Sequence, residues 1–600
     1  MNNKEMNSSR LILFFLKGSK RYFVLSALFA VCLVVFELIN PRVLGYSIDF
    51  IIGDMDQMPE WLLELIERCN GRDYLIHRLW IIGLVVIGIS LVGALFRYLF
   101  MITNSKGSEH LVLRMRDVLY HHIIRLPFCW FDQNKTGDII QRCTSDVDMI
   151  KNFISNQLTN LVRMGLMIVL ALVFMGGISL KLTAIIFFFI PILIIYSLLF
   201  HNKIAASFEK VDNEEGKLSA VVQENLAGVR VVRAFGRESY ERERFESKNE
   251  VYTGMWVHMM KILTRFWITS DVIASLQMVT LLVFGAYFTI NGSITSGEFV
   301  AFIAYERLLM WPVRELGRII SDMGKAGVSL DRLKYIMNSE EEKDDENAVD
   351  FPEDKTICFE GVSFAYTSEN KDVLSKVSFT IKPGETIGII GATGCGKTTI
   401  LQLLGNFYEL ARDKGTITVG GIDIRNIKKS ELRKNIGYVL QEPFLFSKNL
   451  EENITVTRSE VSKEELDTAI RRAALTGTVK KFKDGLKTMV GERGVTLSGG
   501  QKQRTAIAQI FIANPPILVF DDSLSAVDSA TDMEIRKGIR EAGRDNTLII
   551  VSHRVTSIMD ASQIFVLEEG RIVESGNHEQ LIEIGGRYKN IYELQTRGLF

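Results

Sequence analysis

Paired cysteines are missing from this chain. Its six cysteines among 600 residues are scattered, and no two of them have the C-x-x-C spacing. They are Cys32, Cys69, Cys129, Cys143, Cys358 and Cys395. Zinc sites and disulfide frameworks both depend on regular cysteine spacing. The pattern therefore indicates neither of them, and it suits a reducing compartment for the soluble part of the chain.

An excess of charge and a cleavable leader are lacking as well. The formal net charge is −1, so global electrostatics give no argument for nucleic acid or an anionic surface as a partner. The first apolar run is too long for the hydrophobic region of a signal peptide and has no small-residue cleavage site. We interpret this run as a membrane anchor.

Long hydrophobic runs, in contrast, are abundant. Hydrophobic residues make up 47% of the chain and charged residues 24%, which indicates a membrane protein with a large soluble part. The apolar runs stop near residue 320, and each is close to the roughly 20 residues needed to cross a bilayer. We expect six spans, at about residues 22–50, 79–103, 157–179, 182–201, 266–290 and 296–320.

Flanking charges orient these spans. Basic residues precede the first span, at Arg10, Lys17, Lys20 and Arg21. Most of the charged residues in the loop over residues 53–77 are acidic. The same loop contains Trp61–Ile66, which has the pattern of an interfacial amphipathic helix. Because basic residues gather on the cytoplasmic side, we predict a multi-pass protein of the cell membrane with a cytoplasmic N-terminus. An even number of spans returns the second half of the chain to the cytoplasm.

Two long polar stretches join spans on the cytoplasmic side. Residues 104–156 and 202–265 are charged and have helical spacing, so we expect helical extensions of the spans. A short crossing helix is expected at a break in each, near Phe131–Gly137 and near Asp212–Lys217.

The domain boundaries follow from where the apolar runs end. The acidic stretch Ser339–Asp350 lacks apolar periodicity, which is typical of a solvated linker. We predict a transmembrane domain over residues 1–325, a linker over 326–354 and a soluble domain over 355–600.

Charged residues also occur within the predicted spans, at Glu37, Arg163, Asp271, Glu306 and Arg307. Such residues usually face the interior of a helix bundle or a water-filled cavity. They indicate either contacts to a substrate or gate, or ion pairs inside the membrane. Several aromatic residues would suit an apolar cavity or a lipid-facing surface: Phe187, Phe188, Phe189, Trp267 and Trp311.

The first functional motif of the soluble domain is a phosphate-binding loop. The predicted strand Ile387–Ile390 leads into Gly391-Ala-Thr-Gly-Cys-Gly-Lys-Thr-Thr399, and a helical pattern follows. Glycines let backbone N–H groups surround phosphates, and the helix N-terminus adds partial positive charge. Lys397 would reach the β- and γ-phosphates, and Thr398 would bind magnesium. The nucleotide-binding residues predicted here are Gly391, Thr393, Gly394, Cys395, Gly396, Lys397, Thr398 and Thr399.

Further motifs follow in a fixed order. The stretch Leu497-Ser498-Gly499-Gly500-Gln501 opens a helix with a polar glycine pair, which is typical of a second anion site. Gln441 lies in Val439–Pro443, Ser525–Asp528 follows an apolar strand, and His553 lies in Val551–Arg554. With the six preceding spans, this set resembles the exporter branch of the ATP-binding cassette family, over essentially the whole chain. The implied fold is a membrane α-helical domain followed by an α/β P-loop nucleotide-binding domain.

The resemblance implies a role for each matching residue. Tyr366 would stack on adenine, and His553 would lie near the γ-phosphate of ATP. Thr398, Gln441 and Asp521 would serve Mg²⁺. In this family the ATP held by a partner half-transporter is capped by Ser498, Gly499, Gly500 and Gln501. Asp528 contacts the opposite cassette, that is, the nucleotide-binding domain of the partner. The segment Gly491–Gly494 would meet the cytoplasmic loops.

One position departs from the family pattern. The strand Ile517–Phe520 ends in Asp521-Asp522, whereas relatives have Asp-Glu, with the glutamate as the base that polarises water. The shorter carboxylate of Asp522 would lie about 1.5 Å farther back, which predicts good ATP binding and poor hydrolysis. Because the other motifs are intact, the chain resembles the degenerate-site subunit of a heterodimeric multidrug exporter. A homodimer with slow sites is the alternative.

We therefore predict ATP-driven export of hydrophobic or amphipathic compounds by one half of a dimer. A lipid or peptide exporter of the same architecture is a second hypothesis. A nucleotide-gated channel or a regulatory subunit is a third, from another class of protein.

Overall fold

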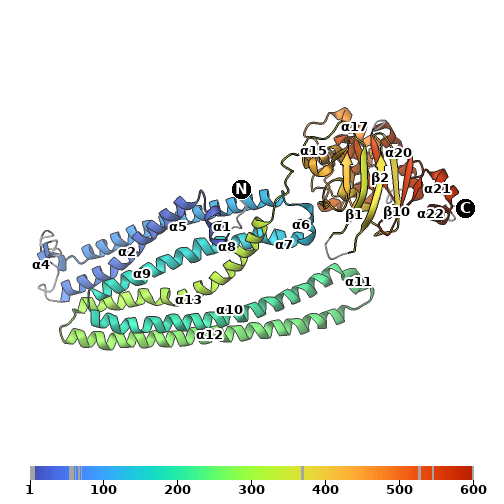
Figure 1. The fold of residues 1–600 in the computed structure, drawn as a ribbon. Helices are drawn as coiled ribbons and strands as arrows, with labels where there is room; N and C mark the ends of the chain where they lie inside the picture. The colour runs from blue at the N-terminus through green and yellow to red at the C-terminus, as the bar shows by residue number, and fades with distance from the viewer. Residues whose placement is uncertain are drawn as a thin grey trace. The chain divides into compact units, whose positions relative to one another are not determined.

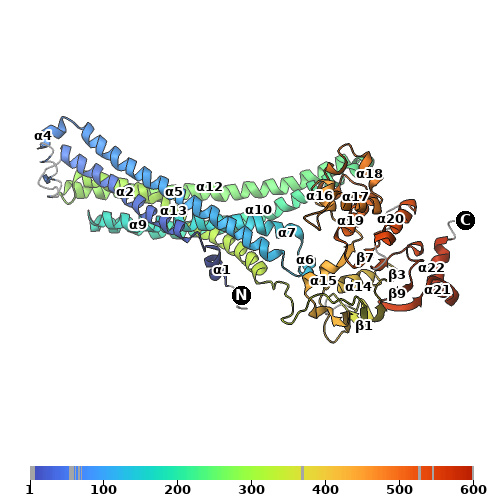
Figure 2. The ribbon, with the colours of Figure 1, turned by 90° about the horizontal axis from the view of Figure 1, so that it is seen from above.

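Figures 1 and 2 show a computed structural model of the chain. The structure describes residues 7–52, 60, 63–64, 68, 71–366, 371–523, 529–542 and 546–596. The expected Trp61–Ile66 helix and the segment Ser525–Asp528 thus lie wholly or mainly outside the described residues. The chain forms two compact units, Met1–Arg125 with Asn134–Glu340 and Leu126–Gln133 with Glu341–Phe600, and each is described by itself.

The first unit is a bundle of long helices. Its elements are α1 Ser8–Phe15, α2 Lys20–Ile52, α4 Gly71–Ile76, α5 Trp80–Ile123, α7 Thr136–Gln141, the π-helical turns η2 Arg142–Asp146 and η3 Phe153–Leu158, α8 Val147–Asn152, α9 Thr159–Gly176, α10 Leu180–Ala227, α11 Val229–Ala234, α12 Glu238–Ile290 and α13 Ser296–Asn338. Each expected span falls largely in a different long helix: α2, α5, α9, α10, α12 or α13. In the described part of the chain, five helices are long and apolar enough to cross a membrane. The sixth, α13, carries Glu298, Glu306 and Arg307 within its first turns, which lowers its hydropathy.

Close backbone contact joins α2 to α13. A Cβ atom at Gly297 would lie 2.0 Å from the Gly45 carbonyl oxygen, so only glycine fits there. The buried Asp49 carboxylate accepts a hydrogen bond of 2.7 Å from the Gly297 N–H and a second one from the Thr295 hydroxyl. It thereby caps the N-terminus of α13. Further along the same helix, Phe302 and Tyr305 are fully buried in the apolar core of the bundle.

Most of the charged residues expected within the spans are paired. Glu37 binds Arg97 at 2.7 Å and lies 4.0 Å from Arg163. Asp271 binds the buried Arg314 at 2.7 Å. These residues form ion pairs, in agreement with one of the two alternatives that the sequence left open, and the side chains of Arg97 and Asp271 are more than half exposed.

Two sequence expectations about this unit were wrong. Residues 212–217 do not interrupt the chain but lie inside α10, which packs along α12 and buries Val211 and Val221 on either side. This packing outweighs the low helix propensity of Gly216, and the helix ends instead at Gly228.

The linker does not begin at residue 326, because α13 continues to Asn338 and buries Leu333 and Ile336. The break expected near Phe131–Gly137 is present and lies between α6 (Phe128–Gln133) and α7.

The second unit contains two sheets and a set of short helices. A four-stranded antiparallel sheet has the order β2-β1-β4-β5, and a six-stranded, mostly parallel sheet has the order β10-β9-β3-β8-β7-β6. The strands are β1 Ile357–Phe364, β2 Leu374–Ile381, β3 Thr386–Gly391, β4 Thr416–Val419, β5 Ile422–Asp423, β6 Ile436–Val439, β7 Ile517–Asp521, β8 Thr547–Val551, β9 Gln563–Glu568 and β10 Arg571–Gly576. The α-helices are α6, α14 Lys397–Leu404, α15 Lys429–Asn435, α16 Leu450–Ile454, α17 Lys463–Arg472, α18 Thr476–Lys481, α19 Gly499–Ala513, α20 Ser529–Ala542, α21 His578–Ile584 and α22 Arg587–Thr596.

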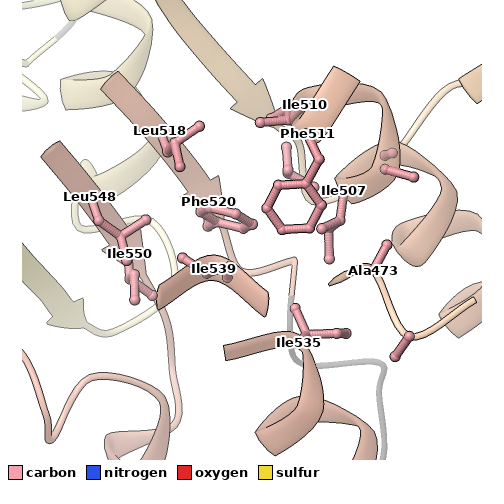
Figure 3. Packing of buried hydrophobic residues seen from close by; sticks show 14 of the residues in the cluster. Ala473, Ile507, Ile510, Phe511, Leu518, Phe520, Ile535, Ile539, Leu548 and Ile550 are labelled. Atoms are coloured by element: carbon pink, nitrogen blue, oxygen red, sulfur yellow. The ribbon is translucent and has the colours of Figure 1, made fainter. Parts of the chain in front are cut away.

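The core of this unit holds the carboxyl ends of the parallel strands in place. Strands β7 and β8 are buried along their whole length, which is why they read as continuous apolar runs. Figure 3 shows Phe520 of β7 among Ile507 and Phe511 of α19 and Ile539 of α20. The residues after β3, β7 and β8 therefore emerge side by side at one edge of the sheet.

Candidate nucleotide site

The loop between β3 and α14 is shaped by its glycines. Gly394 and Gly396 have φ angles of +82° and +104°, which side chains other than hydrogen rarely allow. A Cβ atom at Gly391 would lie 2.2 Å from the Leu567 carbonyl oxygen. The loop therefore curls tightly above the sheet and ends at the N-terminus of α14, where no side chain caps the helix. Such an N-terminus favours an anion.

A cavity of about 510 Å³ opens beside this loop. It is lined by Tyr366, Val373, Thr393, Gly394, Gly396, Lys397, Thr398, Thr399, Gln441, Asp521, Asp522 and His553. The structure thus brings together residues that lie up to 187 positions apart in the sequence (553 − 366). Of the residues predicted for the chain's own ATP site, Gly391 and Cys395 are not part of the lining; Cys395 is buried and Gly391 ends β3.

Lys397 contributes the positive charge of the cavity. Its side chain is buried, and its Nζ atom donates to the Gly391 and Ala392 carbonyl oxygens at 3.0 and 2.9 Å. A buried ammonium group is costly without an anionic partner. Both of these hydrogen-bond partners are neutral carbonyls, so a phosphate group suits this position.

Asp521 and Thr398 meet in the lining of the cavity. The Thr398 hydroxyl donates a hydrogen bond to the Asp521 carboxylate. Burial raises the pKa of Asp521, and the neighbouring Asp522 raises it further, whereas Lys397 and His553 oppose the shift. A hydroxyl and a carboxylate oxygen are hard ligands of the kind that Mg²⁺ prefers together with substrate phosphates. The residues present therefore fit a magnesium nucleotide.

Asp522 directly follows β7 in an unusual backbone conformation. Its φ angle is +43°, and its N–H donates to the Val551 carbonyl oxygen at 2.9 Å. Aspartate tolerates the left-handed region better than most residues do. Its carboxylate is partly buried and belongs to the cavity lining.

Tyr366 lies at the outer side of the cavity with 42% of its surface exposed. Its hydroxyl bonds to Thr399 at 2.9 Å and to Gln402 at 2.8 Å, and burial raises the pKa of this phenol. The ring of Tyr408 packs edge-on against it, with 5.0 Å between ring centroids and 84° between ring planes. An exposed ring face held in this way is suitable for stacking on a base.

Tyr408 is a residue that sequence reasoning missed. It is largely buried, and its hydroxyl donates to the carboxylate of Asp132 on α6. Phe128 of the same helix packs against both Phe407 and Tyr408. The aromatic pair after α14 was the available signal, but nothing in the sequence linked it to α6.

The second anion motif lies elsewhere in this unit. Ser498 and Gln501 form a capping box at the N-terminus of the 15-residue helix α19. The Ser498 N–H donates to the Gln501 side chain at 2.8 Å. Ser498 and Gly499 are exposed, and none of the residues 498–501 lines the cavity.

The fold and the cavity together define a class of protein: a membrane-spanning helical bundle joined to a P-loop ATPase domain. Comparison with known families narrows the class. Residues 23–313 match the ABC transporter transmembrane region, and residues 374–525 match the ABC transporter domain.

Relatives match along most of their length. The uncharacterized ABC transporter ATP-binding protein YknU of Bacillus subtilis (strain 168) is 33% identical over 96% of both chains. The probable multidrug resistance ABC transporter ATP-binding/permease protein YheI of the same organism is 35% identical over 83% of this chain and 85% of its own. The ATP-dependent lipid A-core flippase of Haemophilus influenzae (strain 86-028NP) is 31% identical, over 86% and 88%.

A solved structure has the same fold. The structure of a bacterial Atm1-family ABC exporter with ATP bound aligns with a TM-score of 0.79 at 25% identity, covering 96% of this chain and 99% of the other. The chain belongs to the ABC transporter family. It is a multi-pass membrane exporter with an ATPase domain, and exporters of this family act as dimers in a bilayer. The predicted family, fold class and ATPase activity are confirmed.

Proposed function

We propose that this chain is the degenerate-site half of a heterodimeric exporter, which binds ATP firmly at its own P-loop and hydrolyses it slowly. The observation that carries this proposal is Asp522. It directly follows Asp521 and lines the same cavity as most of the predicted ATP-binding residues, among them Lys397 and His553.

The length of the side chain that carries the carboxylate determines the rate of ATP hydrolysis. Asp522 has one methylene group fewer than glutamate, which retracts the carboxylate by about 1.5 Å. A general base must lie within about 2.6–3.2 Å of the proton that it takes, and an error of about 1 Å can cost on the order of a hundredfold. Binding does not depend on this base, so affinity for ATP is retained while hydrolysis is slow.

The remaining cavity residues have separate roles. Tyr366 stacks on the adenine, Lys397 neutralises the β- and γ-phosphates, and His553 contacts the γ-phosphate. Thr398, Gln441 and Asp521 hold the magnesium ion, which screens phosphate charge. Thr393, Gly394, Gly396 and Thr399 shape the loop that surrounds the phosphates.

The motif Ser498–Gln501 serves the partner half. These residues do not line this chain's cavity, and Ser498 is exposed at a helix N-terminus, where a phosphate can approach. We propose that they cap the ATP held by the partner. The partner supplies the catalytic glutamate of that second site. Closure of the two cassettes then moves the bundle through short helices such as α6.

Conversion of Asp522 to Glu in the assembled complex tests the proposal. We expect ATPase activity to rise, by an order of magnitude or more at this site, and Asp522→Asn to leave the total rate nearly unchanged. Both variants should retain ATP binding in chain-resolved photolabelling with 8-azido-ATP. The proposal is wrong if the chain alone already turns over rapidly and Asp522→Glu leaves that rate unchanged. Co-purification then separates a heterodimer, which contains a second similar chain, from a homodimer.

The cargo that we propose is a hydrophobic or amphipathic compound. The similarity to YheI, whose name describes a probable multidrug transporter, favours drugs. The similarity to lipid A-core flippases favours lipid export as a second candidate. ATP-driven uptake of a fluorescent cationic dye into inverted vesicles, compared with movement of a labelled lipid between leaflets, separates the two. Single-channel conductance in liposomes would instead indicate a nucleotide-gated channel.

A further inference from the structure

The last helix of the chain contacts the segment that contains His553. Gln595, near the end of α22, donates from Nε2 to the His553 carbonyl oxygen at 2.7 Å. Its Oε1 atom accepts from the Val555 N–H at 2.9 Å. One amide side chain thus binds the backbone of two residues that lie two positions apart. Figure 2 shows α22 beside α21 at the C-terminal end of the chain.

Other bonds hold the two ends of the same segment. Before His553, the Ser552 N–H donates to the Ile389 carbonyl oxygen of β3 at 3.1 Å. After it, Val555 is buried and begins the short helix η7 (Val555–Ser557), and Arg536 donates to the Thr556 carbonyl oxygen at 2.6 Å. Gln595 acts between these anchors, at the peptide groups next to His553.

Helix α22 is itself firmly attached to the cassette. The Glu574 carboxylate of β10 accepts hydrogen bonds from the N–H groups of Arg587 and Tyr588 at the helix start. Tyr588 is fully buried, and its hydroxyl bonds to His578 Nδ1 at 2.7 Å. The anchored helix therefore holds Gln595 in a fixed position. A rigid support of this kind maintains the geometry of a functional group.

We propose that Gln595 is a positioning residue for His553: through its two backbone bonds it keeps the imidazole directed into the nucleotide cavity. His553 lines this cavity, whereas Gln595 does not. The inference rests on the proposed contact between His553 and the γ-phosphate. It makes the C-terminal helix a determinant of how well the site distinguishes ATP from ADP.

A comparison of ATP and ADP affinities tests the His553 contact selectively. ADP lacks this group, so loss of the His553 contact weakens ATP binding and leaves ADP binding unchanged. Two neutral hydrogen bonds, each with a modest net value, together correspond to about a tenfold to thirtyfold loss. A general distortion of the cassette would weaken both nucleotides alike.

The experiment uses the full-length chain assembled with its partner. Chain-resolved photolabelling with 8-azido-ATP, displaced by ATP or by ADP, measures the affinity of this chain's site for each nucleotide. We compare Gln595→Ala, Gln595→Glu and His553→Ala with the matched control Leu594→Ala, whose side chain is 73% exposed on the same helix. Gln595→Glu keeps the acceptor for Val555 but places a carboxylate oxygen against the His553 carbonyl oxygen. Because these two acceptors repel each other, Gln595→Glu should be at least as harmful as Gln595→Ala.

The expected result is a tenfold or greater loss of ATP affinity in both Gln595 variants, with ADP affinity and the control unchanged. Gln595→Ala should add nothing in a His553→Ala background, because both changes remove the same contact. Equal losses for ATP and ADP, full additivity, or no effect of Gln595→Ala would overturn the inference. If His553→Ala itself leaves ATP affinity unchanged, the proposed role of His553 fails, and the inference fails with it. If His553→Ala lowers ATP affinity as expected but Gln595→Ala has no effect, only the inference about Gln595 is refuted, and the proposed role of His553 stands.

Discussion

The Tyr408 hydroxyl donates a hydrogen bond to the Asp132 carboxylate, so helix α6 is tied to the residue that packs against Tyr366. Residues 126–133 belong to the compact unit of the cassette, although the chain on both sides of them belongs to the helical bundle. Burial raises the pKa of Tyr408, and the bond to Asp132 raises it further, so the phenol stays protonated and donates. Tyr366 of the nucleotide cavity and the short helix α6 are therefore connected through Tyr408.

Removing this bond should weaken the coupling between transport and hydrolysis. We expect Tyr408→Phe to destabilise the contact by about 1 kcal/mol, because Asp132 is exposed and water replaces part of the lost bond. Stimulation of ATPase activity by transported compounds should fall several-fold, while the affinity for ATP changes little. The matched control is Tyr438→Phe, which removes a hydroxyl that bonds to the Leu401 carbonyl oxygen and not to α6. Equal loss of stimulation in both variants would contradict this prediction.

Replacing Gly396 with alanine should abolish firm ATP binding. The added Cβ atom would lie 2.6 Å from Leu374 Cδ2 and 3.0 Å from the Val373 carbonyl oxygen, at a φ angle of +104°. The backbone conformation alone costs about 1–2 kcal/mol, and the contacts force the loop to move. We expect at least a tenfold loss of ATP affinity in photolabelling. Gly421→Ala, at φ +74° with open space around it, is the control and should bind ATP normally.

The thiol of Cys395 should react slowly and in a pH-dependent way. Burial raises the pKa of Cys395, although nearby Lys397 opposes the shift. Only the thiolate reacts, so the labelling rate should stay below that of a free cysteine peptide near pH 8 and increase as the pH rises. Peptide-resolved mass spectrometry after brief exposure to N-ethylmaleimide measures this rate. Saturating ATP should slow labelling of Cys395 but not of Cys358 on β1, and fast labelling at pH 7 would contradict the prediction.

Truncation of Phe520 should destabilise the cassette without touching the nucleotide. Phe520 is 1% exposed and packs against α19 and α20 (Figure 3). Phe520→Ala removes this packing and leaves a cavity, which typically costs about 3–5 kcal/mol. Thermal unfolding of the purified transporter should show the cassette melting at a markedly lower temperature. Phe520→Leu keeps most of the volume, so its effect should be clearly smaller; equal effects would mean that the ring does not fill this core.

The local patterns in the sequence predicted much of the architecture. Six apolar runs became parts of six different long helices, and the glycine-rich loop between Ile390 and Lys397 formed the curve that its φ angles require. These predictions succeeded because span length and loop conformation depend on residues close together in the chain. The roles of the individual site residues stay predictions, although the structure places most of them around one cavity.

Local patterns failed where packing at a distance decided the outcome. Gly216 and its polar neighbours indicated a break, but α12 packs along α10 and keeps that helix continuous. Likewise the bonds from Tyr408 to Asp132 and from Gln595 to His553 join residues 276 and 42 positions apart.

The sequence by itself determined which residues can serve a nucleotide and that an aspartate, Asp522, follows Asp521, because side-chain chemistry and motif spacing are local properties. Only the tertiary structure decided which of those residues share a cavity, that α6 packs with the cassette, and that the last helix holds the peptide groups beside His553. These depend on how buried surfaces meet, and each contact forms only when distant segments are already folded against one another.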